Sequence, residues 1–245
     1  MCHTIHSMSD IQVFDDKTLL AEAAAKQTVE ILKAAIDEYS RASWVLAGGS
    51  TPLLAYKIIA SQYADAIDWE KVTVIIGDER IGPLDGPDNN WNVIDDIIGE
   101  LTTIKIRPMS DLSAEEAAED YSQQLTDLPT VDNGLPRLDL LWLGVGEDGH
   151  TLSLFPQHNS LLPSSDLVIA VHDSPKPPRD RISLSLRALQ GTQEALILAT
   201  GSDKKEVVSI AQKAGSLPIA LAVSIIKTHD GNITWLVDQD AAPTD

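Results

Sequence analysis

Short apolar runs that end at glycine or at charged residues recur along this chain, and they limit its fold more than any other feature. Runs of four to six apolar residues suit strands that are buried on both faces of a parallel sheet. Segments with apolar residues at helical spacing separate several of these runs. The alternation predicts a single α/β domain with a doubly wound, mostly parallel, Rossmann-like sheet and helices on both faces. The predicted strands are 44–47, 72–76, 140–143, 167–171, 182–186, 194–199 and 233–237, and the clearest helices are 18–37, 53–59 and 113–125.

Length and composition fit a globular protein. The chain has 245 residues, of which 43% are hydrophobic, enough to bury a large core as one domain. No apolar run approaches the roughly 20 residues of a membrane helix, and the first residues lack the apolar stretch of a signal peptide. We therefore expect a cytoplasmic protein. The single cysteine, Cys2, excludes an internal disulfide and a cysteine-based metal cluster.

The charge balance is strongly acidic. Eighteen basic residues face 37 acidic ones, for a net charge of −19. Such a field repels nucleic acid and anionic membranes, so we expect neither as a partner, and it also favours solubility. A site for an anionic substrate must gather several of the few cations against this field.

The segment 139–156 combines a buried strand with a loop rich in chemical groups. Gly144, Gly146 and Gly149 follow the strand and allow sharp turns and close approach to a ligand. Asp148 and His150 lie in the same loop, at the strand end where open α/β sheets bind ligands. The glycines match the dinucleotide fingerprint G-x-G-x-x-G. However, Pro156 follows too soon for the long helix that the fingerprint requires, so no nicotinamide or flavin cofactor is expected.

A second glycine loop follows strand 44–47. Its residues Gly48, Gly49, Ser50 and Thr51 precede Pro52, with Thr51 a candidate N-cap and Pro52 the first helical residue. A glycine loop at a helix N-terminus favours an anion site. Ser50 has two other readings, as a simple cap or as a nucleophile, although Pro52 takes the last glycine position of the nucleophile elbow.

Charged residues follow other strands at the same edge. Asp78 and Arg80 come directly after strand 72–76 and either line the site or form a simple ion pair. Residues 81–92 read as a turn-rich segment. Lys204 begins a helix after strand 194–199, with Asp203 and Glu206 as a capping pair. The proline-rich segment 172–181 carries three cations and is either a mobile flap or a solvated turn.

Five segments in order resemble the 6-phosphogluconolactonase family, hydrolases of the pentose phosphate pathway, over nearly the whole chain. They are 46–52, 77–80, 144–156, 181–185 and 201–204. The family shares a Rossmann-like sheet with sugar-phosphate isomerases and amino-sugar phosphate deaminases, so the fold alone does not choose the reaction. Deaminases typically continue from Asp-Gly-His into Gly-Phe-Asn-Glu, whereas Thr-Leu-Ser-Leu-Phe-Pro follows here, as in lactonases. Leu152 replaces the alanine usual in lactonases, which changes volume but removes no chemical group.

The resemblance implies a role for each of these segments. His150 would act first as a base and then as an acid, with Asp148 orienting its ring and favouring its protonated form. Asp78 and Arg80 would line the sugar end, with Arg80 a candidate oxyanion donor. The residues implied at the substrate phosphate are Gly48, Gly49, Ser50, Thr51, Arg181, Lys204 and Lys176, with Arg179 and Lys205 ranked lower.

No metal or other cofactor is implied, and the histidines show no metal-ligand spacing. His158, His172 and His229 are expected to be surface or core residues. The implied partner is a phosphosugar lactone, and the chain is expected to be a monomer or a small homo-oligomer. Two other functions remain: an amino-sugar-phosphate deaminase or isomerase, and a non-catalytic sugar-phosphate sensing domain. The acidic charge argues against the DNA-binding part that such sensors usually carry.

Overall fold

The computed structural model describes residues 10–102, 104–213 and 215–243, so Cys2 lies outside the described residues. A seven-stranded sheet forms the centre, in the order β1-β10-β9-β6-β2-β3-β5, and every neighbouring pair is parallel. Its strands are β1 (Asp10–Phe14), β2 (Ala42–Leu46), β3 (Val72–Ile76), β5 (Ile104–Ile106), β6 (Leu138–Gly144), β9 (Thr192–Ala199) and β10 (Asn232–Asp238). The predicted parallel α/β sheet is confirmed.

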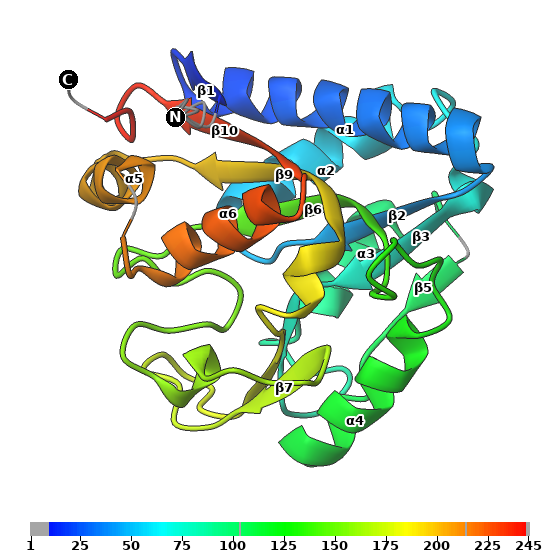
Figure 1. Ribbon diagram of the computed structural model, residues 1–245. Helices are drawn as coiled ribbons and strands as arrows, with labels where there is room; N and C mark the ends of the chain where they lie inside the picture. Colours follow the sequence, from blue (N-terminus) through cyan, green and yellow to red (C-terminus); the bar gives the residue numbers. More distant parts are fainter. Residues whose placement is uncertain (1–9, 103, 214, 244–245) are drawn as a thin grey trace, which may run out of the picture.

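Helices cover both faces of this sheet (Figure 1). The helices are α1 (Lys17–Tyr39), α2 (Ser50–Gln62), α3 (Asn90–Ile98), α4 (Ala114–Leu125), α5 (Lys205–Gln212) and α6 (Pro218–Thr228). Short 3-10 turns are η1 (Trp69–Lys71), η2 (Asn159–Leu161), η3 (Ala188–Gly191) and η4 (Ser202–Lys204). Right-handed crossovers place α1, α2 and α3 on one face, and α4, α5 and α6 on the other, because the chain reverses its direction across the sheet after β5. None of the described helices is long and apolar enough to cross a membrane.

The core is centred on β2 and β6, whose side chains are almost all buried. Trp44 of β2 and Trp142 of β6 meet at 5.2 Å between ring centroids, and Tyr56 of α2 stacks on Trp142 at 4.9 Å. These aromatic contacts add to the hydrophobic burial that fixes α2 against the sheet. The N-terminus of α2 is thereby held at the carboxyl edge.

A second, three-stranded antiparallel sheet lies beside that edge. Its order is β4-β8-β7, formed by β4 (Asp78–Arg80), β8 (Arg181–Leu184) and β7 (Val168–Val171). The sequence predicted two of these strands but neither β4 nor the separate sheet. Arg80 pairs with Arg181 across this sheet, and Asp78 pairs with Ser183. Two charged segments that are distant in sequence therefore become neighbours.

Helix α3 corrects the prediction of a turn-rich segment over 81–92. Its N-cap is Asn89, whose side chain accepts a hydrogen bond from the Asn92 N–H. The buried Glu79 carboxylate accepts two more, from the N–H groups of Asn90 at 2.7 Å and Trp91 at 2.8 Å. These acceptors satisfy the free N–H groups of the first helical turn. Strands β1 and β5 and helix α6 were also not predicted.

The capping predictions had mixed outcomes. Ser113 and Glu116 form the predicted capping box of α4. Helix α2 begins at Ser50 with Gly49 as its cap, so the Thr51 N-cap was wrong. The predicted capping pair of Asp203 and Glu206 was also wrong, because α5 begins at Lys205 after η4 and its cap makes no side-chain bond.

Candidate active site

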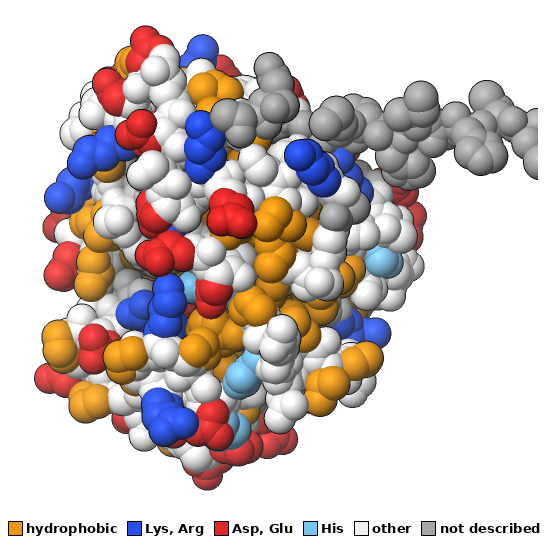
Figure 2. Space-filling view, turned by 90° about the vertical axis from the view of Figure 1, so that its left-hand side faces the viewer, with side chains coloured by type: hydrophobic (Ala, Val, Ile, Leu, Met, Phe, Trp, Pro, Cys, Tyr) orange, Lys and Arg blue, Asp and Glu red, His pale blue; other side chains and the backbone are white. Residues whose placement is uncertain are grey.

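A cavity of about 280 Å³ lies at the carboxyl edge, between the central sheet and the small sheet. All the predicted site residues line it except Asp148, and the lower-ranked Arg179 and Lys205 do not line it. Figure 2 looks onto the carboxyl edge, where basic and acidic side chains are mixed around a hydrophobic area. The lining residues are Ala47, Gly48, Gly49, Ser50, Thr51, Pro52, Asp78, Arg80, Asn90, Gly144, Val145, Gly146, His150, Thr151, Leu152, Lys176, Arg181, Leu198, Ala199, Thr200 and Lys204.

The loop after β6 holds His150 against Asp148. Oδ1 of Asp148 lies 2.5 Å from Nδ1 of His150 and also accepts the His150 backbone N–H at 3.1 Å. A carboxylate on Nδ1 places the ring proton there, which leaves Nε2 as the free acceptor of the neutral ring. Asp148 therefore lies behind His150 as its orienting partner rather than in the cavity wall.

Burial sets the protonation state of this pair. It lowers the pKa of His150, and this effect exceeds the opposite effect of the Asp148 carboxylate. Asp148 does favour the protonated form of the ring, as predicted, but its effect on the pKa is smaller than that of burial. Burial by itself would raise the pKa of Asp148, but the hydrogen bonds from the His150 side chain and backbone outweigh it, and the pKa falls. The pair at neutral pH is a neutral imidazole on a carboxylate, which is the form that can accept a proton.

Packing leaves the His150 ring little freedom. A Cβ at Gly146 would lie 2.0 Å from Nδ1 of His150, so only glycine fits beside the ring. The Phe155 ring also packs against it, with 4.9 Å between the two ring centroids. Gly149 has φ of +82°, which lets the loop turn back between Asp148 and His150.

The opposite end of the cavity is built at the N-terminus of α2. Gly48 approaches Asn90 so closely that a Cβ would lie 2.4 Å from its Oδ1. The Thr51 hydroxyl lies 2.9 Å from that of Thr200, which joins the loops after β2 and β9. Backbone N–H groups at a helix N-terminus favour an anion. Ser50 is the first residue of α2 and does not cap it.

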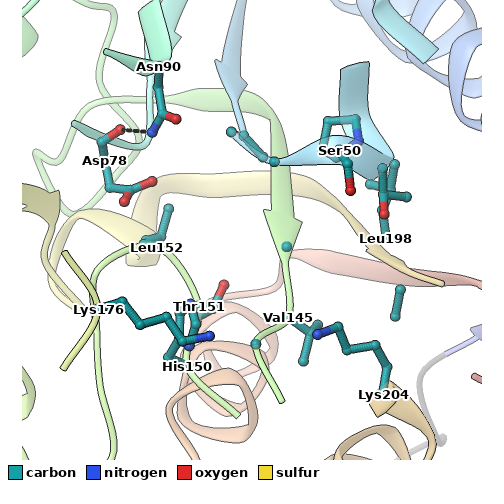
Figure 3. Close-up of a pocket in the computed structure, with 18 of the residues that line it drawn as sticks. Ser50, Asp78, Asn90, Val145, His150, Thr151, Leu152, Lys176, Leu198 and Lys204 are labelled. Atoms are coloured by element: carbon teal, nitrogen blue, oxygen red, sulfur yellow. Dashed lines mark hydrogen bonds between the residues drawn. The ribbon is translucent and has the colours of Figure 1, made fainter. Parts of the chain in front are cut away.

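Lysines from two other loops reach this space. Lys176 and Lys204 extend from opposite sides with their ammonium groups pointing toward each other (Figure 3). Nζ of Lys204 lies 2.8 Å from Asp203 and 3.9 Å from Glu147. Among the residues that the structure describes, no carboxylate lies within ion-pair distance of Lys176, although its charge helps to lower the pKa of His150.

The small sheet supplies Asp78, Arg80 and Arg181. Asp78 accepts a hydrogen bond from the Ser153 hydroxyl at 2.6 Å, and Arg80 donates to the Asp88 carbonyl at 2.7 Å. Within the described part of the chain, Asp78 and Arg80 form no ion pair with each other. The prediction of a simple ion pair between them was therefore wrong. Arg181 is 5% exposed, and burial lowers its pKa while Asp78 opposes this effect.

Arg181 also orders the proline-rich segment. Its guanidinium donates to the carbonyls of Lys176, Pro177 and Pro178, at 2.9 to 3.1 Å. The Ser174 hydroxyl adds a bond to the Lys176 carbonyl at 2.7 Å. The segment is therefore an exposed loop that is ordered by hydrogen bonds to its backbone.

Sequence reasoning missed several residues around the cavity. Asn90 lines it and donates to the backbone carbonyl of Asp78 at 3.1 Å, and Thr151 and Thr200 line it too. Burial raises the pKa of Glu79, which anchors the start of α3. The run of asparagines at 89, 90 and 92 is a helix-cap signal that could have located α3.

The cavity is cationic in an acidic protein. Four basic side chains line it, Arg80, Lys176, Arg181 and Lys204, against the single carboxylate of Asp78. The cations that an anionic ligand requires are thus gathered here. No group of three or more His, Cys, Asp or Glu arranged to hold a metal ion occurs in the described ranges.

Comparisons with known proteins agree with this geometry. The 6-phosphogluconolactonase of Mycobacterium tuberculosis is 34% identical over 247 residues, which cover 96% of this chain and 97% of that one. The chloroplastic 6-phosphogluconolactonase 3 of Arabidopsis thaliana is 31% identical over 95% of this chain and 74% of its own length.

Solved structures show the same fold. The 6-phosphogluconolactonase of Trypanosoma brucei has a TM-score of 0.81 and 28% identity, covering 95% of this chain and 97% of that one. The enzyme of Leishmania guyanensis has a TM-score of 0.84 and 25% identity, with the same coverage. The sequence profile described as "Glucosamine-6-phosphate isomerases/6-phosphogluconolactonase" matches residues 15–235. The chain therefore belongs to this family of glucosamine-6-phosphate isomerases and 6-phosphogluconolactonases.

Proposed function

We propose that the protein hydrolyses 6-phospho-D-glucono-1,5-lactone to 6-phospho-D-gluconate, the second step of the oxidative pentose phosphate pathway. The observation that carries the proposal is the hydrogen bond between His150 and Asp148 at the wall of a cationic cavity. The names of the relatives support the same reaction. The proposal treats residues 1–245 as one lactonase-like domain that acts in the cytoplasm on a small phosphosugar, as a monomer or small homo-oligomer.

The chemistry needs a base, an oxyanion donor and an acid. In the proposal, Nε2 of His150 takes a proton from water as the water oxygen attacks the lactone carbonyl carbon. The carbonyl oxygen gains negative charge, which Arg80 stabilises as donor. As the bond between that carbon and the ring oxygen breaks, the imidazolium returns its proton to the ring oxygen. Asp148 balances the transient charge on the ring, and the acid product loses its proton to solvent. Side chains thus supply each of these steps without a metal.

The phosphate is assigned to the end of the cavity at α2. The N–H groups around Gly48, Gly49, Ser50 and Thr51 favour an anion, and Lys204 and Lys176 add two ammonium charges. Arg181 contributes its positive field and, through the carbonyls it binds, the position of the Lys176 loop. Binding energy from this non-reacting group would hold the lactone carbonyl against His150.

The deciding experiment follows the decay of freshly generated 6-phosphoglucono-δ-lactone with wild-type protein and with His150→Ala, without added metal. We expect rapid hydrolysis by wild type and a loss of at least about 100-fold in the variant. An unchanged spontaneous rate with wild type would reject the lactonase, and ammonia release from glucosamine 6-phosphate would then test the deaminase. A fully active variant would instead reject the assigned base.

A further inference from the structure

The loop that carries Lys176 into the cavity is pinned at its base by His172. Residues 172–180 connect β7 to β8, and Val171 pairs with Arg181 as the last pair of that ladder. The next pair is made by side chains, since Nδ1 of His172 lies 2.8 Å from Oδ1 of Asp180. The base of the loop is therefore closed by His172, together with the Ile81 N–H, which donates to the Asp180 carbonyl at 3.0 Å.

The second ring nitrogen of His172 ties the loop to another element. Nε2 lies 2.9 Å from Oε1 of Glu115, in the first turn of α4. A ring with a carboxylate on each nitrogen donates from both only when it is protonated. His158 adds a bond through its Nε2 to the His172 carbonyl at 2.8 Å, while its Nδ1 accepts the Ser160 N–H.

Two other charged residues of the loop pair with each other. Arg179 and Asp173 form an ion pair at 2.7 Å, and both side chains are largely exposed. The charged groups facing His172 are thus Asp180 from the loop and Glu115 from α4, and they raise its pKa. Because this pKa is raised in the folded state, the stabilisation is complete below the ordinary value and is lost as pH rises through the folded value.

The tip of the loop depends on this anchorage. Lys176 is exposed, and in the described ranges no carboxylate lies within ion-pair distance of it, so the position of its ammonium group depends on the backbone. The backbone at Lys176 is held by Ser174 of the loop and by Arg181, the first residue of β8. Among the hydrogen bonds and ion pairs of the described residues, the loop is joined to α4 at His172 alone.

We propose that His172 is a positioning residue that, as a cation between Glu115 and Asp180, fixes the loop so that Lys176 stays beside His150 and the bound phosphosugar. This inference rests on the proposed function. It makes the affinity for the phosphorylated substrate depend on a histidine outside the cavity. It also predicts that KM rises above neutral pH, as His172 loses its proton.

The test is a double-mutant cycle with His172→Gln, Lys176→Ala and both together, with His229→Gln as the matched control. His229 is an exposed histidine at the end of α6, and its ring lies 2.9 Å from the Ile225 backbone carbonyl. For two half-exposed ion pairs we expect KM to rise about three- to fivefold in His172→Gln, with kcat nearly unchanged. In the Lys176→Ala background the same change should add almost nothing.

Hydrogen exchange of residues 172–180 gives a readout independent of activity, and it should be faster in His172→Gln but not in His229→Gln. An equal KM effect of His172→Gln with and without Lys176, or a wild-type rise of KM at high pH that persists in His172→Gln, would overturn the inference. If exchange responds while wild type hydrolyses no lactone, the anchor stands and the proposed function fails. If Lys176→Ala leaves KM unchanged, the assigned role of Lys176 fails, and the inference with it.

Discussion

The replacement of Asp148 by Asn tests the core of the mechanism. Its amide keeps nearly the same shape, and its oxygen can still accept from Nδ1 and from the backbone N–H of His150. The ring therefore stays in place, and what is lost is the negative charge beside the imidazolium. The variant separates charge stabilisation from orientation, which Asp148→Ala would remove together.

The size of the loss follows from the geometry. Two unit charges with centres about 4 Å apart interact by about 4 kcal/mol at an effective dielectric constant of about 20. The Asp148 side chain is 38% exposed, so solvent screening reduces this to about 2 to 3 kcal/mol. In the transition state that corresponds to a kcat about 30- to 150-fold lower. KM should change little, because Asp148 does not line the cavity.

The pH dependence supplies a second readout. The Asp148 carboxylate raises the pKa of His150 against the larger effect of burial, so its loss should move the acidic limb of kcat/KM to lower pH. Lactone decay measured from pH 5 to 7.5 gives both quantities, with Asp127→Asn, an exposed carboxylate between α4 and β6, as the control. A loss of kcat below about threefold, or an acidic limb that does not move, would refute the assigned pair.

Three further changes test the surroundings of this pair. Gly146→Ala should lower kcat by at least about tenfold at unchanged secondary structure by circular dichroism, because its Cβ displaces the His150 ring; full activity would show that the ring can move without cost. Lys204→Met should raise KM by about tenfold or more with a smaller effect on kcat, as loss of a charge-assisted bond to phosphate predicts, and an unchanged KM would place the phosphate elsewhere. Glu79→Ala should lower the free energy of unfolding by about 3 kcal/mol or more in urea denaturation, because it leaves buried N–H groups, including that of Asn90, without acceptors; a loss below about 1 kcal/mol would mean that water replaces the carboxylate.

The central strands were predictable because burial on both faces leaves an unbroken apolar run. Strands β2, β6 and β9 contain such a run, and in β3 and β10 one threonine interrupts it. Strand β1, at the sheet edge, is mostly half-exposed and mixes polar with apolar residues, and β5 has only three residues. Neither pattern is long enough to separate a strand from a loop without its neighbour in the sheet.

The site residues that directly follow a parallel strand were predictable from the sequence. Glycine loops and charged residues after parallel strands converge at one edge whatever the length between them, and this places His150 near Ser50. The missed residues depend on contacts between segments. Glu79 becomes a helix anchor only when β4 meets α3, and Asn90 reaches the cavity only because Gly48 leaves room for it.

The antiparallel pairing of Arg80 with Arg181 affects the stability of the protein as well as its chemistry. With Lys176 and Lys204 they line one cavity with mutually repelling charges, which the fold holds together at a cost. An anion that binds there only in the folded state removes part of that cost and raises the free energy of unfolding by about 2.7 kcal/mol at a hundred times its Kd. Resistance to heat and proteolysis would then follow the supply of substrate, and the protein would persist longest in cells where it is in use.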